Sequence, residues 1–444
     1  MSKTSVSLKE RQKIKDSLKA TKERRKVQTI KVFELKVNCH HTSKEIFEKL
    51  NDMFKQAKWV INDVIGSKEN VFKYDYKEHR KVINFNKDGN EVEREITLPT
   101  VIHQSLVKSI QTDICNLSKA KKKGIKVGGL KFRSEVNRIP LRNDAIKIKS
   151  SKMIFIPSLK NITVYGLEQF INIPNFEIAN ANLIRKASGF YIKITVFIPK
   201  SNFNRKETNK SVGLDFGIKT AITTSDGEKF DCNKQETDKL KFLQKQLHKK
   251  TKGSKRYYKL LSQIRKEYEH ISNQKDDVAN KIVAHLLKEN DVIYFQDEQI
   301  SKWKKKKIRK LKSKQKKLAK KCGYSFGRQI QHSCLGRVKS KLNVLEKSGR
   351  SYKISKWIPT TKFCPKCCTL NTLTLKDRIY ICDCGYSCDR DVHASKNVKL
   401  FGSTKRTECL EQASVETNTS TLSSVSRLAL QALSVKQEKE ATTL

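Results

Sequence analysis

The stretch SVGLDFGIKT (211–220) decides where the chemistry of this chain lies. It is an apolar strand with an acid inside it, because strand alternation puts three large apolar side chains on one face and Asp215 on the other. Structural aspartates are more typical of turns than of mid-strand positions. Gly213 and Gly217 flank Asp215, and we expect them to remove side chains that would crowd a metal ion and its phosphate.

A second acid follows another apolar strand, in DVIYFQDEQI (291–300). Ligands bind at the carboxyl ends of strands in α/β sheets, and this segment carries two acids at such an end. Glu298 is the predicted second ligand, on the same strand face as Gln296. Asp297, on the opposite face, is the alternative if the strand ends one residue earlier. Two solvated acids at a strand exit would leave the same local pattern.

The third acid opens a predicted helix in DRDVHASKNV (389–398). An acid at a helix N-terminus can simply stabilise the helix, because the helix dipole favours negative charge there. Asp389 is the predicted N-cap, which leaves Asp391 available for a metal. His393 is a further candidate, although a single histidine is more often a packing or hydrogen-bonding residue.

Three acids from well-separated segments suit a phosphodiester hydrolase with two metal ions, in which two divalent cations about 4 Å apart clamp the attacking water and the leaving oxygen. Carboxylate oxygens are hard ligands, so Mg²⁺ or Mn²⁺ is the predicted metal for Asp215, Glu298 and Asp391. The sequence contains no competing Ser/His/Asp set, P-loop or dinucleotide-binding glycine motif.

The composition indicates a polyanionic partner. Lys and Arg outnumber Asp and Glu 94 to 45, which gives a formal net charge of +49. That much self-repulsion argues against an enzyme of small metabolites and favours nucleic acid, whose phosphates release counterions when Lys and Arg replace them. An anionic membrane surface is the alternative, but the sequence has no apolar run of about 18 residues and no signal-peptide pattern. We therefore predict no membrane partner and a cytoplasmic, nucleoid-associated protein of a prokaryote, or a nuclear protein in a eukaryotic host.

Six of the 12 cysteines fall between positions 364 and 388, which in an intracellular chain indicates metal binding rather than disulfides. Two pairs, C-P-K-C and C-D-C, are separated by 14 residues and have the spacing of zinc knuckles at the tips of two short hairpins. The predicted ligands of this structural zinc site are Cys364, Cys367, Cys382 and Cys384. Cys368 and Cys388 are spare and could substitute in another register.

The hydrophobic pattern predicts a multidomain α/β protein. A period of 3.6 alternates along the chain with a period of two, and the β-rich region reads as a small barrel interrupted by a helical piece. The predicted segments are a basic arm (1–27), a first strand (28–38), amphipathic helices at 42–65 and from Pro99 to 123, a β-rich region (130–200), two helices around Gly253 (234–289), a basic run (302–321) and a disordered Ser/Thr-rich tail past 402.

The motifs GLDFG (213–217), QDEQISKW (296–303) and PTTKFCPKC…DRIYICDCG…DRDVHASKN (359–397) together resemble the TnpB-type nucleases of small transposons. The same core occurs in the miniature type V CRISPR effectors. The resemblance covers roughly residues 205–400 and lies in the order and spacing of the motifs around the zinc ribbon. The N-terminal half resembles the family only in its architecture.

The resemblance implies a RuvC nuclease domain of RNase H-like fold and an N-terminal β-barrel with a helical recognition insertion. It also implies an RNA-guided DNA endonuclease with Asp215, Glu298 and Asp391 as catalytic acids, a guide RNA from the transposon end, and a double-stranded DNA target beside a short flanking motif. The implied domains are the basic arm (1–27), a wedge-like barrel (28–42 and 125–204), the recognition insertion (43–124), RuvC segments with a helical insertion and a basic helix (205–360), the zinc ribbon (361–388), the third RuvC motif (389–401) and the tail (402–444).

This chain departs from the family at three points. An ungapped match would place the second acid at Gln296, His393 stands where asparagine is usual, and the second knuckle is C-x-C. Two rival functions are a guide-independent, structure-specific nuclease and a guided DNA-binding protein that does not cleave. The sequence predicts no oligomeric state.

Overall fold

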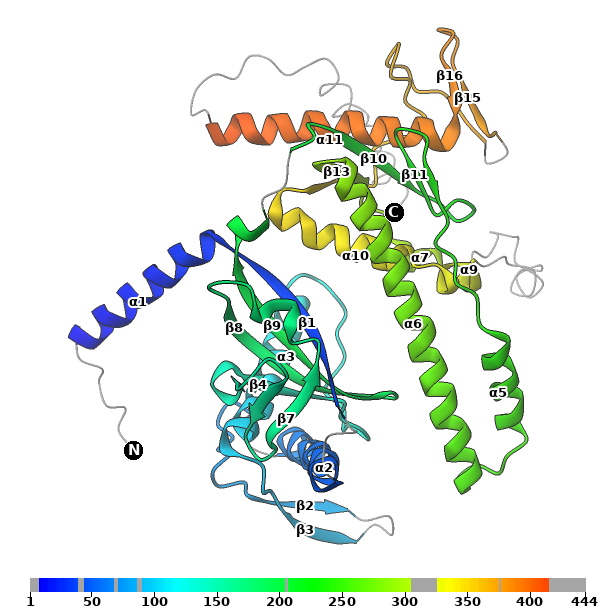
Figure 1. Cartoon of the computed structure of the whole chain (residues 1–444). Coiled ribbons are helices and arrows are strands. Elements are labelled where there is room, and N and C mark those ends of the chain that lie inside the picture. The colour runs from blue at the N-terminus through cyan, green and yellow to red at the C-terminus, as the bar shows by residue number, and fades with distance from the viewer. Residues whose placement is uncertain are drawn as a thin grey trace. The chain divides into compact units, whose positions relative to one another are not determined.

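The computed structural model describes residues 8–38, 44–67, 71–85, 90–203, 207–304, 326–374 and 377–414 (Figure 1). The chain divides into two compact units, Met1–Arg205 and Lys206–Leu444, and each has its own hydrophobic core. In the described part of the chain, no helix combines the length and the apolar character that membrane crossing requires.

The N-terminal unit contains a seven-stranded antiparallel sheet of order β4-β8-β9-β1-β7-β6-β5. Its strands are β1 (Gln28–Val37), β4 (Arg138–Arg142), β5 (Lys147–Ile148), β6 (Met153–Ile156), β7 (Lys160–Tyr165), β8 (Glu177–Lys186) and β9 (Gly189–Pro199). β4 and β5 form opposite edges of the sheet, yet only the short 3-10 helix Asn143–Ala145 and Ile146 separate them in the chain. The sheet must therefore curl until its two edges approach each other.

A helical piece is inserted between β1 and β4. Its elements are α2 (Lys44–Gly66), β2 (Lys81–Phe85), β3 (Glu91–Glu95) and α3 (Thr100–Lys122). The two helices confirm the predicted amphipathic pair, and their apolar faces share one core with the sheet. The β2–β3 hairpin was not predicted, although the dipeptide Asp88-Gly89 is a turn signal. The predicted start of the first of these helices, at residue 42, lies outside the described residues.

The basic arm is helical over Leu8–Lys26 (α1). Its last turn is attached to the sheet through Arg25, whose guanidinium lies 3.0 Å from a carboxylate oxygen of Glu177 and 3.4 Å from the ring centroid of Phe197. The C-terminal end of the arm is therefore attached to β8 and β9.

The C-terminal unit is built on a five-stranded sheet of order β12-β11-β10-β13-β14. The strands are β10 (Ser211–Phe216), β11 (Ile222–Thr224), β12 (Lys229–Phe230), β13 (Val292–Gln296) and β14 (Ser351–Ile354). The first three are antiparallel neighbours, whereas β10, β13 and β14 run parallel. Gly227, in the turn between β11 and β12, has a φ of +93°, a conformation that side chains with a β-carbon rarely adopt.

Helices cover both faces of this sheet (Figure 1). The apolar face of β10 packs with α6 (Lys255–Glu289) and α10 (Leu335–Leu345), which confirms the predicted alternation. On the other face Tyr294 of β13 packs with Val398 and Phe401 of α11 (Arg390–Ser414). The face that carries Asp215 is therefore the face covered by α11.

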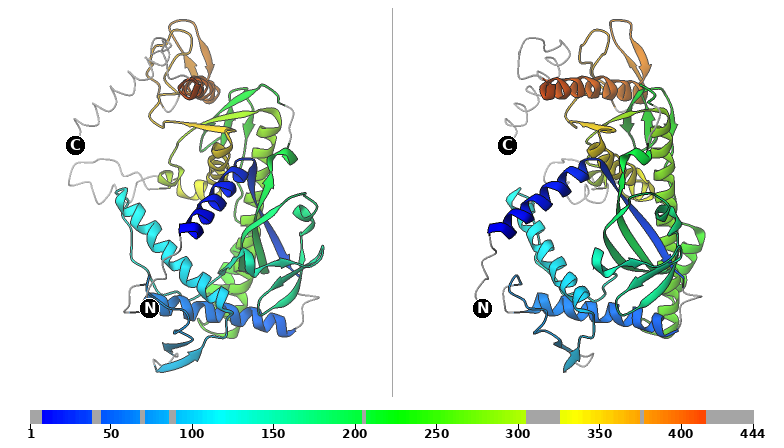
Figure 2. Two further views of the ribbon diagram at one scale, coloured as in Figure 1. Left: turned by 90° about the vertical axis from the view of Figure 1, so that its left-hand side faces the viewer. Right: turned by 60° about the vertical axis from the view of Figure 1, so that its left-hand side comes forward.

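The predicted helix pair around Gly253 is confirmed as α5 (Asp238–His248) and α6, which is 35 residues long. The second half of α6 packs on the sheet, whereas its first half packs against α5 in a separate small core (Figure 2). Tyr268 of α6 is 45% exposed, and Gln244 donates a hydrogen bond of 2.8 Å to its hydroxyl.

The predicted disordered tail past 402 is wrong for its first part, because α11 continues to Ser414. Residues 405–413 are rich in strong helix formers, and extending a helix that is already packed needs no new nucleus. The short helices α7 (Ile300–Trp303) and α9 (Gly327–His332) precede α10. Most of the basic run at 302–321 lies outside the described residues.

Candidate functional site

Gly213 lets α11 lie directly on β10. A β-carbon at residue 213 would lie 2.2 Å from Ser395 O and 2.6 Å from Lys399 N, both backbone atoms of α11. In the same way, a β-carbon on Gly402 of α11 would lie 2.4 Å from the ring of Tyr294. The prediction that Gly213 leaves room for a metal ion is therefore wrong, because the helix occupies that space.

The same contact brings two of the predicted acids to one end of the strand. Asp215 lies two residues beyond Gly213, about 6.6 Å along β10. Asp391 lies four residues before Ser395, about 6 Å along α11. Gly217, the second glycine, serves the turn after β10, where a β-carbon would lie 2.4 Å from a backbone oxygen.

Electrostatics link all three predicted acids. Burial, followed by the negative charges of Asp391 and then Glu298, raises the pKa of Asp215 to about 7. The positive charge of Arg390 opposes this rise. Glu298 and Asp391 therefore both lie near enough to Asp215 to act on its charge, although the three acids are far apart in the sequence.

Parallel pairing explains why Glu298 reaches this edge. β10 and β13 pair in parallel with Leu214 opposite Phe295, so both strands end at the same edge of the sheet. Glu298 follows the end of β13 and is half-buried. Burial raises the pKa of its carboxyl group, whereas the cations of Lys339 and Lys356 lower it.

Lys339 of α10 distinguishes the two acids after β13. Its Nζ lies 2.6 Å from Asp297 Oδ1 and donates to Glu298 O, also at 2.6 Å. The Lys339 side chain is only 15% exposed, whereas that of Asp297 is 50% exposed. Asp297 is thus held by a cation, while the Glu298 carboxylate is not part of that pair. No sequence pattern pointed to Lys339.

Gln296, the other alternative, is buried and bonded to the backbone. Its Nε2 donates to Ser355 O at 3.1 Å and to Ile358 O at 2.9 Å, and its Oε1 accepts from Thr360. These contacts tie the end of β13 to the loop after β14. Gln296 therefore has a structural role at this position.

The predicted N-cap of α11 is confirmed. Asp389 Oδ1 accepts hydrogen bonds from the backbone N–H groups of Asp391 and Val392, at 3.0 and 3.1 Å. The same carboxylate pairs with Lys229 at 3.2 Å. Capping is thus supplied by Asp389, and the carboxylate of Asp391 is not needed for it.

Arg390 links the cysteine-rich segment to the acids. Its Nη1 donates to Asp377 O at 2.9 Å and to Thr374 O at 3.4 Å, and its Nε lies 3.8 Å from Asp391 Oδ1. The side chain is 17% exposed. Arg390 was not singled out from the sequence, where its only signal is its place between two acids.

His393 is a packing residue and does not join the acids. It is fully buried, and its ring stacks on Tyr380 with the centroids 3.7 Å apart. Its Nε2 lies 3.1 Å from Asn397 Nδ2, and burial lowers its pKa to about 4. A neutral imidazole here joins the cysteine-rich segment to α11.

The predicted zinc ligands form a compact group. Their sulfur atoms all lie within 4.8 Å of one another, and no other metal-binding group of this kind occurs among the described residues. Cys364 and Cys384 are 3.6 Å apart and Cys367 and Cys382 are 3.4 Å apart, close to the separation of about 3.8 Å that Zn–S bonds of about 2.3 Å would give in a tetrahedron. The strands beside them are β15 (Ile379–Ile381) and β16 (Ser387–Asp389).

The two spare cysteines lie outside this group. Cys368, in the left-handed region at a φ of 61°, packs against the cluster of apolar residues beneath α11. The sulfur of Cys388 lies 4.0 Å from Lys396 Nζ. The three acids are less tightly grouped than the four thiols, because they do not meet the same 4.8 Å limit.

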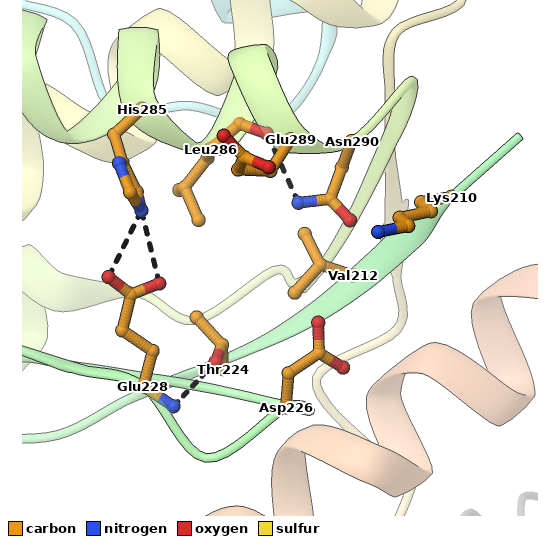
Figure 3. A pocket seen from close by; sticks show the side chains of 9 residues that line it. All are labelled: Lys210, Val212, Thr224, Asp226, Glu228, His285, Leu286, Glu289 and Asn290. Carbon is orange, nitrogen blue, oxygen red and sulfur yellow. Dashed lines mark hydrogen bonds and ion pairs between the residues drawn. The ribbon is translucent and has the colours of Figure 1, made fainter. Parts of the chain in front are cut away.

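A separate cavity of about 210 Å³ lies between the β11–β12 hairpin and the C-terminal end of α6 (Figure 3). Glu228 and His285 form an ion pair across it, at 3.0 Å. None of the three predicted acids lines this cavity. It is therefore not part of the acid site.

Two protein families match parts of the chain. Residues 194–300 match a family described as "Probable transposase", and residues 340–398 match one described as "Cas12f1-like, TNB domain". The first match contains Asp215 and Glu298, and the second contains Asp391 and the four grouped cysteines.

A protein described as a putative RNA-guided DNA endonuclease from Streptomyces pristinaespiralis is 30% identical over 201 residues, which are 44% of this chain and 46% of the relative. The chain thus aligns with less than half of that relative. A cryo-EM structure of a Cas12f1–sgRNA–target DNA complex is 12% identical, with a TM-score of 0.37 over 84% of this chain and 98% of that chain. A score of this size does not establish a shared fold.

Proposed function

We propose that this chain, which its family matches and its curated relative support as a TnpB-type protein, is an RNA-guided DNA endonuclease with Asp215, Glu298 and Asp391 as its catalytic acids. The proposal is supported by the electrostatic effect of Asp391 and Glu298 on Asp215, although these acids come from three distant segments, and by the parallel pairing that ends β10 and β13 at one edge of the sheet. The order β12-β11-β10-β13-β14, with one antiparallel and one parallel half, supports an RNase H-like RuvC domain. The curled N-terminal sheet would be the wedge-like barrel and α2–α3 the recognition insertion.

The acid site fits divalent cations. Mutual repulsion and burial raise the pKa of Asp215, and a bound cation would relieve both. Asp215, Glu298 and Asp391 would hold Mg²⁺ or Mn²⁺, which would activate water and stabilise the leaving oxygen of the phosphodiester. The neighbouring residues keep these carboxylates available: Lys339 pairs with Asp297 rather than Glu298, and Asp389 takes the capping role.

The cysteine group fits a structural zinc ion. Four sulfur ligands in a compact array make a closed site that folds the surrounding hairpins. The folded ribbon would then brace the third acid from two sides, through the stack of Tyr380 on His393 and through Arg390.

The positive charge of the protein and base pairing by the guide RNA would together account for nucleic acid recognition. A net charge of +49 suits a long polyanion, and the relative is named for RNA-guided cleavage of DNA. In this mode the guide RNA pairs with the target strand, and the protein reads only a short flanking motif in the double-stranded DNA. The displaced single strand would then reach the acid site.

Cleavage of a plasmid library tests the proposal. The full chain, expressed with RNA from its own locus, is incubated with plasmids that carry a guide-matched target beside randomised flanking bases. We expect Mg²⁺-dependent cleavage next to one flanking motif, and none by the Asp215→Asn variant although it still binds RNA. Cleavage without RNA would indicate the structure-specific nuclease instead, and target binding without cleavage in Mg²⁺ would indicate the guided binder.

A further inference from the structure

The hairpin of α5 and α6 forms an arm with a long acid-free stretch. Between Asp238 and Glu267, 28 residues include 11 Lys and Arg and no Asp or Glu. Its core is a thin stripe of leucine and isoleucine side chains, separate from the core of the sheet. Folding therefore gathers many cations on the surface of a slender element, although their mutual repulsion opposes this.

One face of α6 carries three lysines and an aromatic ring in a row. Lys255, Tyr258, Lys259 and Lys266 recur at helical spacing, on the side opposite the buried Ile264. All four side chains are exposed, and Tyr258 is 60% exposed. These four residues are called the α6 row. Over its length of roughly 16 Å it presents positive charge around a stacking surface.

The outer face of α5 differs in its charge. Asp238 is fully exposed at its beginning, and Lys241 pairs with it at 2.9 Å. Within the part of the chain that the structure describes, the lysines of the α6 row have no carboxylate within 4.0 Å. The first turn of α6 also carries no acid, although the helix dipole favours one there. The α6 row thus retains an electrostatic cost that a polyanion would remove.

We infer that the α6 row binds a single-stranded segment of nucleic acid, with its lysines on phosphates and Tyr258 stacked on a base. A basic track with an exposed aromatic ring is the combination that sequence-independent single-strand binding uses. A duplex would use the lysines but offer no unpaired base to the ring. The inference rests on the proposed function and deepens it, because a displaced target strand and an unpaired part of a guide RNA share this chemistry.

Binding measurements on the full chain test the row without cleavage. In an Asp215→Asn background, fluorescence anisotropy is recorded with a labelled single-stranded DNA of about 16 nucleotides, with RNA of the same sequence and with the DNA duplex. One variant carries K255Q, K259Q and K266Q. A matched control carries K241Q, K245Q and K249Q, which removes the same charge from α5. Tighter binding of the DNA strand would indicate the displaced target strand as the ligand, and tighter binding of the RNA strand would indicate the guide RNA.

The salt dependence of binding is the decisive quantity. Loss of three phosphate contacts should lower the slope of log K against log salt by about 2 for a single strand, whereas the α5 control keeps its slope. Tyr258→Ala should weaken single-strand binding at least about 5-fold and leave duplex binding unchanged, while Tyr258→Phe retains affinity.

Each of the following results would overturn the inference. Equal slopes for both triple variants mean that the α6 row is only a solvated surface. A changed slope with no effect of Tyr258→Ala means that a duplex is the ligand. If the unaltered chain binds all probes and both triple variants behave like it, only this inference fails. If the unaltered chain binds none of the probes, the proposed function fails as well.

Discussion

Replacing Gly213 by alanine should damage the acid site without touching an acid. The added β-carbon would lie 2.2 Å from Ser395 O, whereas real contacts of this kind are essentially never shorter than 3.0 Å. Both nearest atoms belong to the backbone of α11, so no flexible side chain can move aside. The helix must shift by about 1 Å, and overpacking of this kind costs about 1–3 kcal/mol of unfolding free energy. Because Asp391 lies in the first turn of α11, a shift of the helix by about 1 Å would displace its carboxylate and should lower the cleavage rate about 100-fold.

The assay is single-turnover cleavage of a guide-matched DNA, together with thermal unfolding of the same preparations. Gly336→Ala is the matched control, because a β-carbon there meets nothing within 4 Å. Gly336 is the second residue of α10, so alanine should change the unfolding free energy by less than about 1 kcal/mol and leave cleavage unchanged. Wild-type cleavage by Gly213→Ala, with an unchanged melting temperature, would refute the close packing of α11 on β10 and with it the argument for the position of Asp391.

Three further predictions concern Lys339, Asp215 and the cysteine group. Lys339→Met leaves Asp297 and a backbone oxygen of Glu298 without their cation. It should lower the unfolding free energy, measured by denaturant titration, by about 1–3 kcal/mol and slow cleavage. An unchanged unfolding free energy and cleavage rate would show that Lys339 has no role at the site. In the metal-free protein, folding raises the pKa of Asp215 from 3.8 to about 7. Between these two pH values the folded state therefore holds a proton that the unfolded state releases. The stability that this proton contributes is present at low pH and is lost as the pH rises toward 7. Asp215→Asn should therefore raise the melting temperature above pH 7 much more than below pH 3.8, and an equal effect at both pH values would contradict the shift. Cys364→Ser should reduce bound zinc from about one ion per chain and lower the soluble yield, and a normal zinc content would contradict the ligand assignment.

The parts of the structure that were predictable depend on local pattern. Alternation along 211–217 predicted which face of the strand is buried, because a strand repeats every two residues whatever lies above it. The capping role of Asp389 follows from the same kind of rule, since it needs only the first turn of its own helix. The cysteine group was predictable because thiol spacing within two hairpins nearly fixes the geometry.

The parts that were missed depend on tertiary contacts. The sequence placed Gly213 on the face of Asp215 but could not say that α11, nearly two hundred residues later, fills that space. Lys339 is one lysine among many, and only folding brings it to Asp297. His393 was open to two interpretations until its stack on Tyr380 and its complete burial were known.

Each acid of the site is held by a different kind of contact. Asp215 is fixed by strand pairing, Glu298 by the bond from Lys339 to its backbone, and Asp391 by the seating of α11. These three contacts lie in separate parts of the unit, so none of them can restore the position of an acid whose own contact is lost. Without a cation, the negative charges of Asp391 and Glu298 raise the pKa of Asp215, so these contacts hold the acids near one another against electrostatic repulsion. At low Mg²⁺ concentration, the loss of two of these contacts should therefore reduce the cleavage rate by the product of the two single effects. Saturating Mg²⁺ should reduce the difference in cleavage rate between the variants and the unaltered chain, because a bound cation draws the acids together.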